Sequence, residues 1–151
     1  MAVNPNTDFS SGAVLTAAQQ NRFPRGVMGY QLYAGGSFTA TTTSTAITGI
    51  SITFTGEANR LYRAIFTGEC QSVTSAHRTT AIIKNGASNV VEGVTYAGAN
   101  DYSQLTAIAL FTATGSTTVT VTAKADANTS VILGIASPNN MTFIVEDVGA
   151  I

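Results

Sequence analysis

The chain has 151 residues, of which 44% are hydrophobic and only 10% are charged, and its formal net charge is −1. This length and apolar content suit a single domain with a hydrophobic core of its own. The seven lysines and arginines are scattered along the chain, which argues against nucleic-acid binding through a phosphate-neutralising patch. Charged residues are fewer than usual, and Thr, Ser, Ala, Asn and Gly stand in their place. A surface of this composition is more typical of a packed assembly than of a free enzyme.

The single cysteine, Cys70, excludes an intrachain disulfide, and we expect a buried, inert thiol. The sequence contains neither a basic and apolar leader nor a run of about 18 apolar residues. We therefore expect a protein that is made in the cytoplasm, carries no signal peptide and does not insert into a membrane.

The first distinctive stretch is residues 9–28. Thr16-Ala17-Ala18-Gln19 matches the capping box, in which the Thr hydroxyl accepts the N3 backbone N–H and the Gln amide reaches back to the cap. A short helix should begin at Ala17, and Pro24 limits it to about two turns, because proline lacks a backbone donor and disfavours helix at the preceding residue.

A helix of that length is marginal in water on its own. We therefore predict an N-terminal arm over residues 1–29, ahead of a β-domain over residues 30–151. The arm docks on a neighbouring copy or another protein, folds back on its own domain, or is disordered in the isolated chain. The candidate attachment residues are apolar anchors, the capping threonine and a charge contact: Val14, Leu15, Thr16, Phe23, Met28 and Arg25, with Arg22 as the alternative to Arg25.

After the arm, alternating apolar and polar residues predict strands separated by turns every 8 to 12 residues. Residues 39–45, nearly all threonine, are expected to be an exposed connection, with an edge strand as the alternative. Asn85-Gly86 is typical of a tight hairpin. The expected strands are 30–34, 50–55, 61–69, 78–84, 89–96, 103–113, 118–124, 131–136 and 141–148.

Eight or nine strands with no helical periodicity beyond the arm predict an all-β fold, an antiparallel, jelly-roll-like β-sandwich. Strand 61–69 is partly apolar on both faces and is expected to be central. Glu146 and Asp147 are adjacent on a strand and so point to opposite faces, which does not suit a carboxylate pair acting on one substrate. Glu146 is expected to be a structural partner for an arginine such as Arg63.

Three strands, 105–111, 131–136 and 141–145, are apolar on both faces, whereas a sandwich needs only one apolar face. We expect the second face to pack against another copy of the chain; the alternative is a central strand covered by loops. The candidate interface residues are Leu105, Phe111, Ile132, Leu133, Phe143 and Val145.

The sequence contains little catalytic chemistry. His77 is the only histidine, no cysteine stands at ligand spacing from it, and no G-x-S-x-G or phosphate-binding glycine pattern occurs. We therefore expect a protein that is not an enzyme and binds no cofactor or metal. An aromatic and polar loop, Tyr96, Asn100, Asp101 and Tyr102, is of the kind that binds sugars or protein surfaces, with a plain surface loop as the alternative.

Three stretches resemble small virion proteins of tailed bacteriophages, often described as minor tail proteins. FSSGAVLTAAQQNRFPRGVMG at residues 9–29 resembles their G-x-V-L-T-A-A-x-x-N opening and the P-R-G-V element that follows it. ISITFTGEANRLYRAIFTGE at residues 50–69 is similar to their strand pair, with Arg60 and Tyr62-Arg63 in equivalent places. FIVEDVGAI at residues 143–151 resembles their VEDIGP terminus, with Ala150 in place of the proline.

A looser similarity, in the order of residues 81–86, strand 118–124 and the closing apolar strand, is to the trimeric jelly roll of the tumour necrosis factor and complement-head type. Together the resemblances imply a non-enzymatic structural protein of the virion, in the tail, the collar or the capsid decoration. The arm would meet other virion proteins, and the β-domain would form a homo-oligomer, expected to be a trimer. The alternative is a receptor- or carbohydrate-binding module that binds a host surface glycan during adsorption.

Overall fold

The structure, a computed structural model, describes residues 12, 14–33, 37–73, 75–126, 131–133 and 141–151. Within them the chain forms one four-residue helix and ten strands. In chain order these are α1 (Ala17–Gln20), β1 (Gly26–Leu32), β2 (Phe38–Ala40), β3 (Thr45–Gly56), β4 (Arg60–Ser72), β5 (His77–Asn85), β6 (Ser88–Ala97), β7 (Tyr102–Thr112), β8 (Gly115–Ala125), β9 (Val131–Leu133) and β10 (Met141–Ala150).

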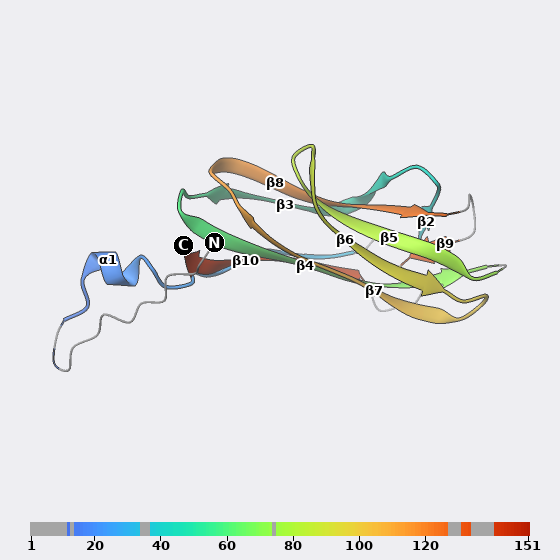
Figure 1. The fold of residues 1–151 in the computed structure, drawn as a ribbon, viewed down its shortest axis with the longest axis horizontal. Coiled ribbons are helices and arrows are strands. Elements are labelled where there is room, and N and C mark those ends of the chain that lie inside the picture. Colours follow the sequence, from blue (N-terminus) through green and yellow to red (C-terminus); the bar gives the residue numbers. More distant parts are fainter. Residues whose placement is uncertain (1–11, 13, 34–36, 74, 127–130, 134–140) are drawn as a thin grey trace.

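The strands form two antiparallel sheets stacked as layers (Figure 1). In the first, here called sheet A, β4 pairs with β7 along one side and with β10 along the other, and β1 pairs with the far side of β10. The short β9 pairs with the end of β4 beyond β10, and β2 pairs with β9. In sheet B the order is β3-β8-β5-β6. The predicted antiparallel jelly-roll sandwich is therefore confirmed.

Alternation along the strands decides which side chains enter the core. Ile50, Ile52 and Phe54 of β3 are buried while the residues between them are exposed, as the period-2 pattern predicts. The prediction that strand 61–69 is central is also confirmed, because β4 lies between β10 and β7. The fully buried side chains include Tyr62, Phe66, Ile83, Leu105, Val119, Val121, Met141 and Phe143.

An aromatic cluster fills one part of the core between the sheets. Phe54 and Tyr62 have ring centroids 4.9 Å apart, and Phe111 lies 6.0 Å from Tyr62 and 6.5 Å from Phe54. These are tilted and edge-on geometries of the favourable kind. β3, β4 and β7 thus contact one another in the core through large aromatic side chains.

Turns lie where the sequence places them. β5 and β6 form the predicted hairpin, with Asn85 paired to Ser88 and Gly86 at φ 58°, a region in which glycine carries no steric penalty. Asn59, in the predicted turn between β3 and β4, also has a positive φ of 60°. Asparagine tolerates this region better than most other residues.

The largest differences from the predicted strand boundaries are in the first third of the chain. β1 begins at Gly26, four residues before the expected start. β3 begins at Thr45, and its pairing register with β8 shifts between Ala46 and Ser51. This irregularity interrupts the period-2 apolar pattern, so the pattern does not show where the strand begins. β2 covers residues 38–40 and so takes in the first two residues of the threonine-rich segment, whereas residues 41–44 form the expected connection. The predictions for residues 1–8, 34, 127–128 and 134–140 lie outside the described residues.

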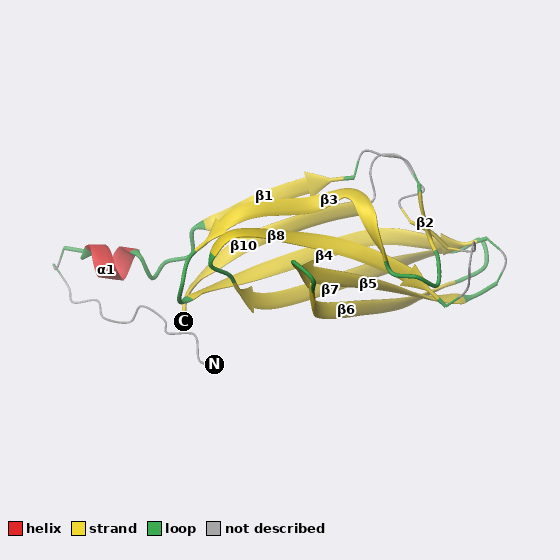
Figure 2. Cartoon of the chain, turned by 90° about the horizontal axis from the view of Figure 1, so that it is seen from above, coloured by secondary structure: helices red, strands yellow, loops and turns green. Residues whose placement is uncertain are grey.

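The arm leaves the sandwich at the end where the C-terminus lies, and α1 projects beyond that end (Figures 1 and 2). No side chain of α1 is buried. Residues 26–29, which the predicted boundary assigns to the arm, form the start of β1. The division of the chain into an arm and a separately folding domain stays a prediction.

Candidate functional site

The arm is fixed to the sandwich by one buried arginine, Arg60, at the start of β4. Its guanidinium makes a bidentate ion pair with Asp147 of β10, through Nε to Oδ2 and through Nη2 to Oδ1 at 2.7 Å, and the two side chains are 4% and 1% exposed. The same guanidinium donates to two arm carbonyls, that of Phe23 at 2.7 Å and that of Asn21. Arg60 and Asp147 are called the arm clamp below.

The residues around the arm clamp satisfy its remaining polar groups. Asp147 Oδ1 also accepts the backbone N–H of Gly149 at 2.8 Å, and the N–H of Ala150 donates to the carbonyl of Arg22 at 3.3 Å. Gly149 has φ 118°, and a Cβ there would lie 3.1 Å from the Arg22 oxygen. A side chain at Gly149 would therefore both strain the backbone and crowd the arm.

A second, more exposed ion pair also joins the arm to the sandwich. Arg25 of the arm donates to Glu57 in the turn between β3 and β4, and this hydrogen bond holds the pKa of Glu57 below its ordinary value and raises that of Arg25. The backbone N–H of Glu57 donates to the buried Tyr62 hydroxyl at 2.9 Å. Together, Arg25 and Arg60 hold residues 21–25 of the arm against the sandwich.

The capping box predicted for the arm is confirmed. Thr16 Oγ1 accepts the N–H of Gln19 at 3.2 Å, and Gln19 Oε1 accepts the N–H of Thr16 at 2.9 Å. Of the predicted anchors, Val14 is 90% exposed, and Leu15, Thr16, Phe23 and Arg25 are exposed as well. Met28 is corrected, because it lies in β1 and packs against the core of its own sandwich.

The outer face of sheet A carries a row of apolar side chains. Tyr30 of β1 pairs with Ile144 of β10, Ile144 with Ile65 of β4, and Ile65 with Ile108 of β7, so the four lie side by side across the sheet. Tyr30 and Ile108 are each more than half exposed, and Ile65 and Ile144 are half-buried. These four residues are called the sheet A row.

Four of the six predicted interface residues lie on the other side of this sheet. Leu105, Phe111, Phe143 and Val145 are buried between the two sheets of a single chain, so they cannot be the surface on which a second copy sits. A strand that is apolar on both faces does not reveal which set points inward, and here the inner set was mistaken for the outer one. For Ile132 and Leu133 of β9 the structure describes only the backbone.

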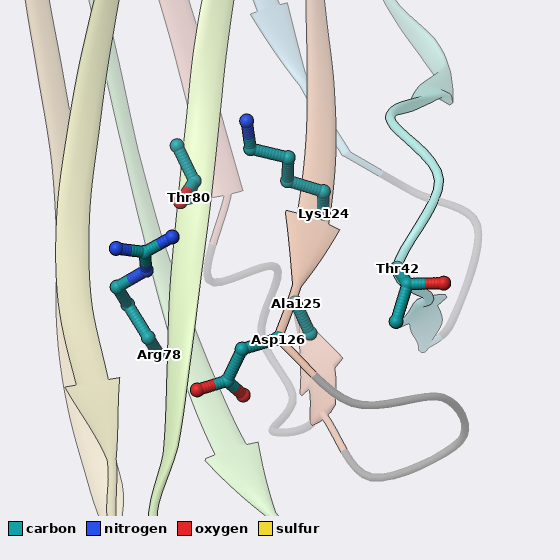
Figure 3. A pocket seen from close by; sticks show the side chains of 6 residues that line it. All are labelled: Thr42, Arg78, Thr80, Lys124, Ala125 and Asp126. Atoms are coloured by element: carbon teal, nitrogen blue, oxygen red, sulfur yellow. The ribbon is translucent and has the colours of Figure 1, made fainter.

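Sheet B has a different outer face, dominated by threonine. Thr53 and Thr118 share a hydrogen bond across β3 and β8 at 2.8 Å, and Thr122 accepts one from Ser44 at 2.8 Å. At one end of this face is a pocket of about 290 Å³, lined by Thr42, Arg78, Thr80, Lys124, Ala125 and Asp126 (Figure 3). It is called the sheet B pocket.

Most side chains of the sheet B pocket come from the ends of β5 and β8 (Figure 3). Thr80 is paired directly with Lys124, and Arg78 stands two residues from Thr80 on the same face. The pKa of Asp126 is held below its ordinary value, first by the backbone N–H of Arg78 and then by His77. Lys124 and Glu92 lie 3.8 Å apart, both partly exposed.

The predicted ligand loop is divided between two surfaces. Tyr96 stands opposite Arg78 on β6, 67% exposed and beside the sheet B pocket, whereas Tyr102 pairs with Gln71 on sheet A. Between them Asn100 has φ 55° and donates its N–H to Ser72 at 2.8 Å, and Asp101 Oδ1 accepts the N–H of Tyr102 at 2.9 Å. The structure thus places Tyr96 next to Arg78, which lines a pocket that the sequence did not reveal; a role for the loop itself stays a prediction.

One arrangement could not be found from sequence. His77 Nε2 and Ser75 Oγ are 3.0 Å apart, and His77 Nδ1 lies 3.0 Å from Asp126 Oδ1, the order of groups in a hydrolytic triad. The serine is exposed, and the sheet B pocket is lined by Asp126 and not by Ser75. This chain of contacts therefore fastens the segment before β5 to the end of β8 and positions Asp126.

The remaining reactive groups are few. Burial raises the pKa of the Cys70 thiol to about 11, which keeps it protonated at neutral pH. Within the described residues no three His, Cys, Asp or Glu side chains come together as a metal site would require. In the same part of the chain, no helix has the length and apolar character needed to cross a membrane.

Comparison with known proteins supports the fold. A tumour necrosis factor, the Eiger protein of S. frugiperda, has a similar structure, with a TM-score of 0.52 and 5% identity over 81% of this chain and 91% of that one. This likeness places the chain among jelly-roll β-sandwiches of the tumour necrosis factor type of architecture. At such low identity, it shows the fold alone.

Two sugar-binding structures show weaker likeness and carry no argument. They are the sugar-binding EclA C-terminal domain, with a TM-score of 0.35, 18% identity and 88% and 96% coverage of the two chains, and the xylan-binding CBM22-1 domain of Paenibacillus barcinonensis Xyn10C, with a TM-score of 0.31, 13% identity and 83% and 96% coverage. No protein-family model matches the sequence, and no curated protein matches it.

Proposed function

We propose that this chain is a non-enzymatic structural protein of a tailed-phage virion, in the tail, the collar or the capsid decoration. Its N-terminal arm attaches to another virion protein, and its β-domain is displayed as a homo-oligomer, a trimer. The three stretches that resemble phage virion proteins include the arm residues 9–29 and both partners of the arm clamp, Arg60 and Asp147.

The arm clamp is the observation that carries the attachment proposal. It holds the arm at Asn21 and Phe23 with a buried charge, while Val14 and Leu15 further out are exposed on a segment that projects from the sandwich. One end of this segment is held by Arg60, and its other end carries exposed apolar side chains. Such a segment is suited to bury those side chains in a partner. Because the arm is short, one copy can bury only a small surface in a partner. Several copies that bind together would therefore strengthen attachment.

The sheet A row supports the oligomer. Four apolar side chains in line across β1, β10, β4 and β7 form a surface that a second copy can cover. The neighbouring ion pair of Arg63 and Glu146 supplies a polar rim. The surface proposed here replaces the one predicted from sequence.

The attachment proposal is tested by deleting residues 1–20, which leaves the residues held by Arg60 and all of β1 in place. We expect the truncated protein to fold with an unchanged unfolding midpoint and to be lost from purified particles. Val14→Asp combined with Leu15→Asp should reduce incorporation in the same way, while the control Gln20→Asp should not. Normal incorporation of the truncated protein would exclude the arm as the attachment segment.

The oligomer proposal is tested by measuring the mass of the protein by light scattering at micromolar concentration. We expect a trimer in the wild type and a monomer after Ile108→Asp, because an unpaired charge would be buried in the interface. Thr55→Asp on the exposed side of sheet B is the matched control and should leave the mass unchanged. A monomeric wild type would contradict the proposal.

A second candidate function is binding of a host surface glycan during adsorption. The observation that favours it is the sheet B pocket, with Arg78, Lys124 and Asp126 in reach of a ligand and the exposed Tyr96 beside it. Substituting Tyr96 with Ala should lower adsorption of particles to cells if this function holds. Unchanged adsorption would favour a purely structural role.

A further inference from the structure

We infer that the sheet B pocket binds the acidic sugar unit of a glycan, whose carboxylate or sulfate group lies at Arg78. This inference deepens the second candidate function and depends on it. The pocket volume of about 290 Å³ is at the small end of ligand pockets, roughly 300–1,000 Å³. That size suits one sugar unit at the end or side of a chain.

Arg78 indicates that the ligand is anionic. Its side chain is exposed at the pocket, and no carboxylate in the described part of the chain forms an ion pair with it. The nearest acidic residue on the pocket wall, Asp126, is engaged by the backbone N–H of Arg78 itself and by His77 at 3.0 Å. A planar guanidinium with free donors matches an anionic group bidentately.

Lys124 adds a second cation on the same face. Its contact with Glu92 is 3.8 Å long, with side chains 33% and 45% exposed, and pairs of this kind are weak. Thr80 is next to both cations, because it pairs with Lys124 of β8 and lies two residues from Arg78 on β5. A ligand anion at Arg78 can therefore also contact Lys124 without displacing a strong ion pair.

Tyr96 indicates that the anionic group belongs to a sugar. It pairs with Arg78 across β5 and β6, so the two side chains are neighbours on one face, and the tyrosine is 67% exposed. A tyrosine presents an apolar ring and a polar tip. The ring suits the apolar C–H face of a sugar, and the adjacent cations suit its anionic substituent; a simple inorganic anion would leave Tyr96 unused.

The experiment is a calorimetric titration of the full chain with three oligosaccharide probes: an oligogalacturonide, a sulfated galacto-oligosaccharide and a neutral galacto-oligosaccharide. We expect at least one anionic probe to bind ten-fold or more tightly than the neutral one, and the tighter of the two identifies the anion as carboxylate or sulfate. Arg78→Gln should remove this preference. Tyr96→Ala should weaken the anionic probe at least five-fold.

Lys84→Gln is the control, because Lys84 stands six residues from Arg78 on the same strand and outside the pocket. It should bind like wild type, and unfolding midpoints should show that all variants fold. Equal binding of the neutral probe, or an anionic preference that survives Arg78→Gln, overturns the inference while the glycan-binding function stands. If no probe binds at millimolar concentration, both are overturned, whereas the attachment proposal is tested separately by particle incorporation.

Discussion

Two arginines three residues apart on β4 form two different kinds of ion pair with neighbouring residues of β10. Arg60 and Asp147 are almost completely buried and also hold the arm, whereas Arg63 and Glu146 lie on the outer face of sheet A, 45% and 25% exposed. The second pair was predicted from the sequence and is confirmed. The first was not predicted.

The two ion pairs have the same chemistry, so they show how burial changes the effect of an ion pair on stability. An exposed pair exchanges one set of hydrogen bonds with water for another and contributes little. A buried pair need not contribute net stability relative to apolar side chains, but loss of one partner strands the other charge out of water. Arg60 therefore acts mainly to position the arm, because two of the three N–H donors that Asp147 leaves free have arm carbonyls as partners.

The largest expected effect comes from breaking the buried side of this comparison. Asp147→Asn leaves the Arg60 charge uncompensated and should lower the free energy of unfolding by about 3–5 kcal/mol, measured by urea denaturation. Proteolysis within residues 21–25 should become faster in the folded protein, because Arg60 no longer fixes that segment. A loss under about 1 kcal/mol would contradict a buried clamp.

An intermediate effect is expected for the hydroxyl beside the clamp. Tyr62→Phe removes the acceptor for the Glu57 N–H while keeping the ring in the aromatic cluster. The unfolding free energy should fall by about 1 kcal/mol. Phe111→Leu is the control for the loss of packing alone, because Phe111 belongs to the same cluster and has no hydroxyl. An unchanged stability for Tyr62→Phe would mean that water replaces the hydroxyl without cost.

A smaller effect is expected on the outer side. Glu146→Gln should cost roughly 0.2–1 kcal/mol in a monomer, and less at high salt. If a second copy covers the sheet A row, the same substitution should also weaken association, because its pair becomes desolvated in the interface. Unfolding curves at two protein concentrations separate the two contributions. A cost as large as that of Asp147→Asn would show that burial is not what distinguishes the pairs.

The smallest effect concerns pH. The folded-state pKa values of Glu57 and Asp126 are depressed, so both contribute stability that is present above their unfolded pKa, about 4, and is lost as pH falls through the folded values. Glu57→Gln and Asp126→Asn should each be slightly less stable than wild type at pH 7. That deficit should shrink as the pH is lowered below about 4, and a deficit that grows in acid would reverse the assigned sign.

Local patterns predicted much of the fold because they depend on neighbours in sequence. The capping box at Thr16, the hairpin at Gly86 and the inward set of β3 each follow from side chains a few residues apart. Glu146 and Asp147 were expected on opposite faces, and they are. Where the backbone irregularity between Ala46 and Ser51 interrupts the period, the prediction started the strand five residues late.

The sequence alone was enough to predict an all-β sandwich with a capped N-terminal helix, because alternation and capping are short-range properties. Only the tertiary structure decided that Leu105 and Phe143 face inward, that Arg60 meets Asp147 and the arm, and that Tyr96 stands beside Arg78 at a pocket. Each of these depends on which strands become neighbours and which face of a doubly apolar strand is covered. That choice is made by packing the whole chain, and no local pattern contains it.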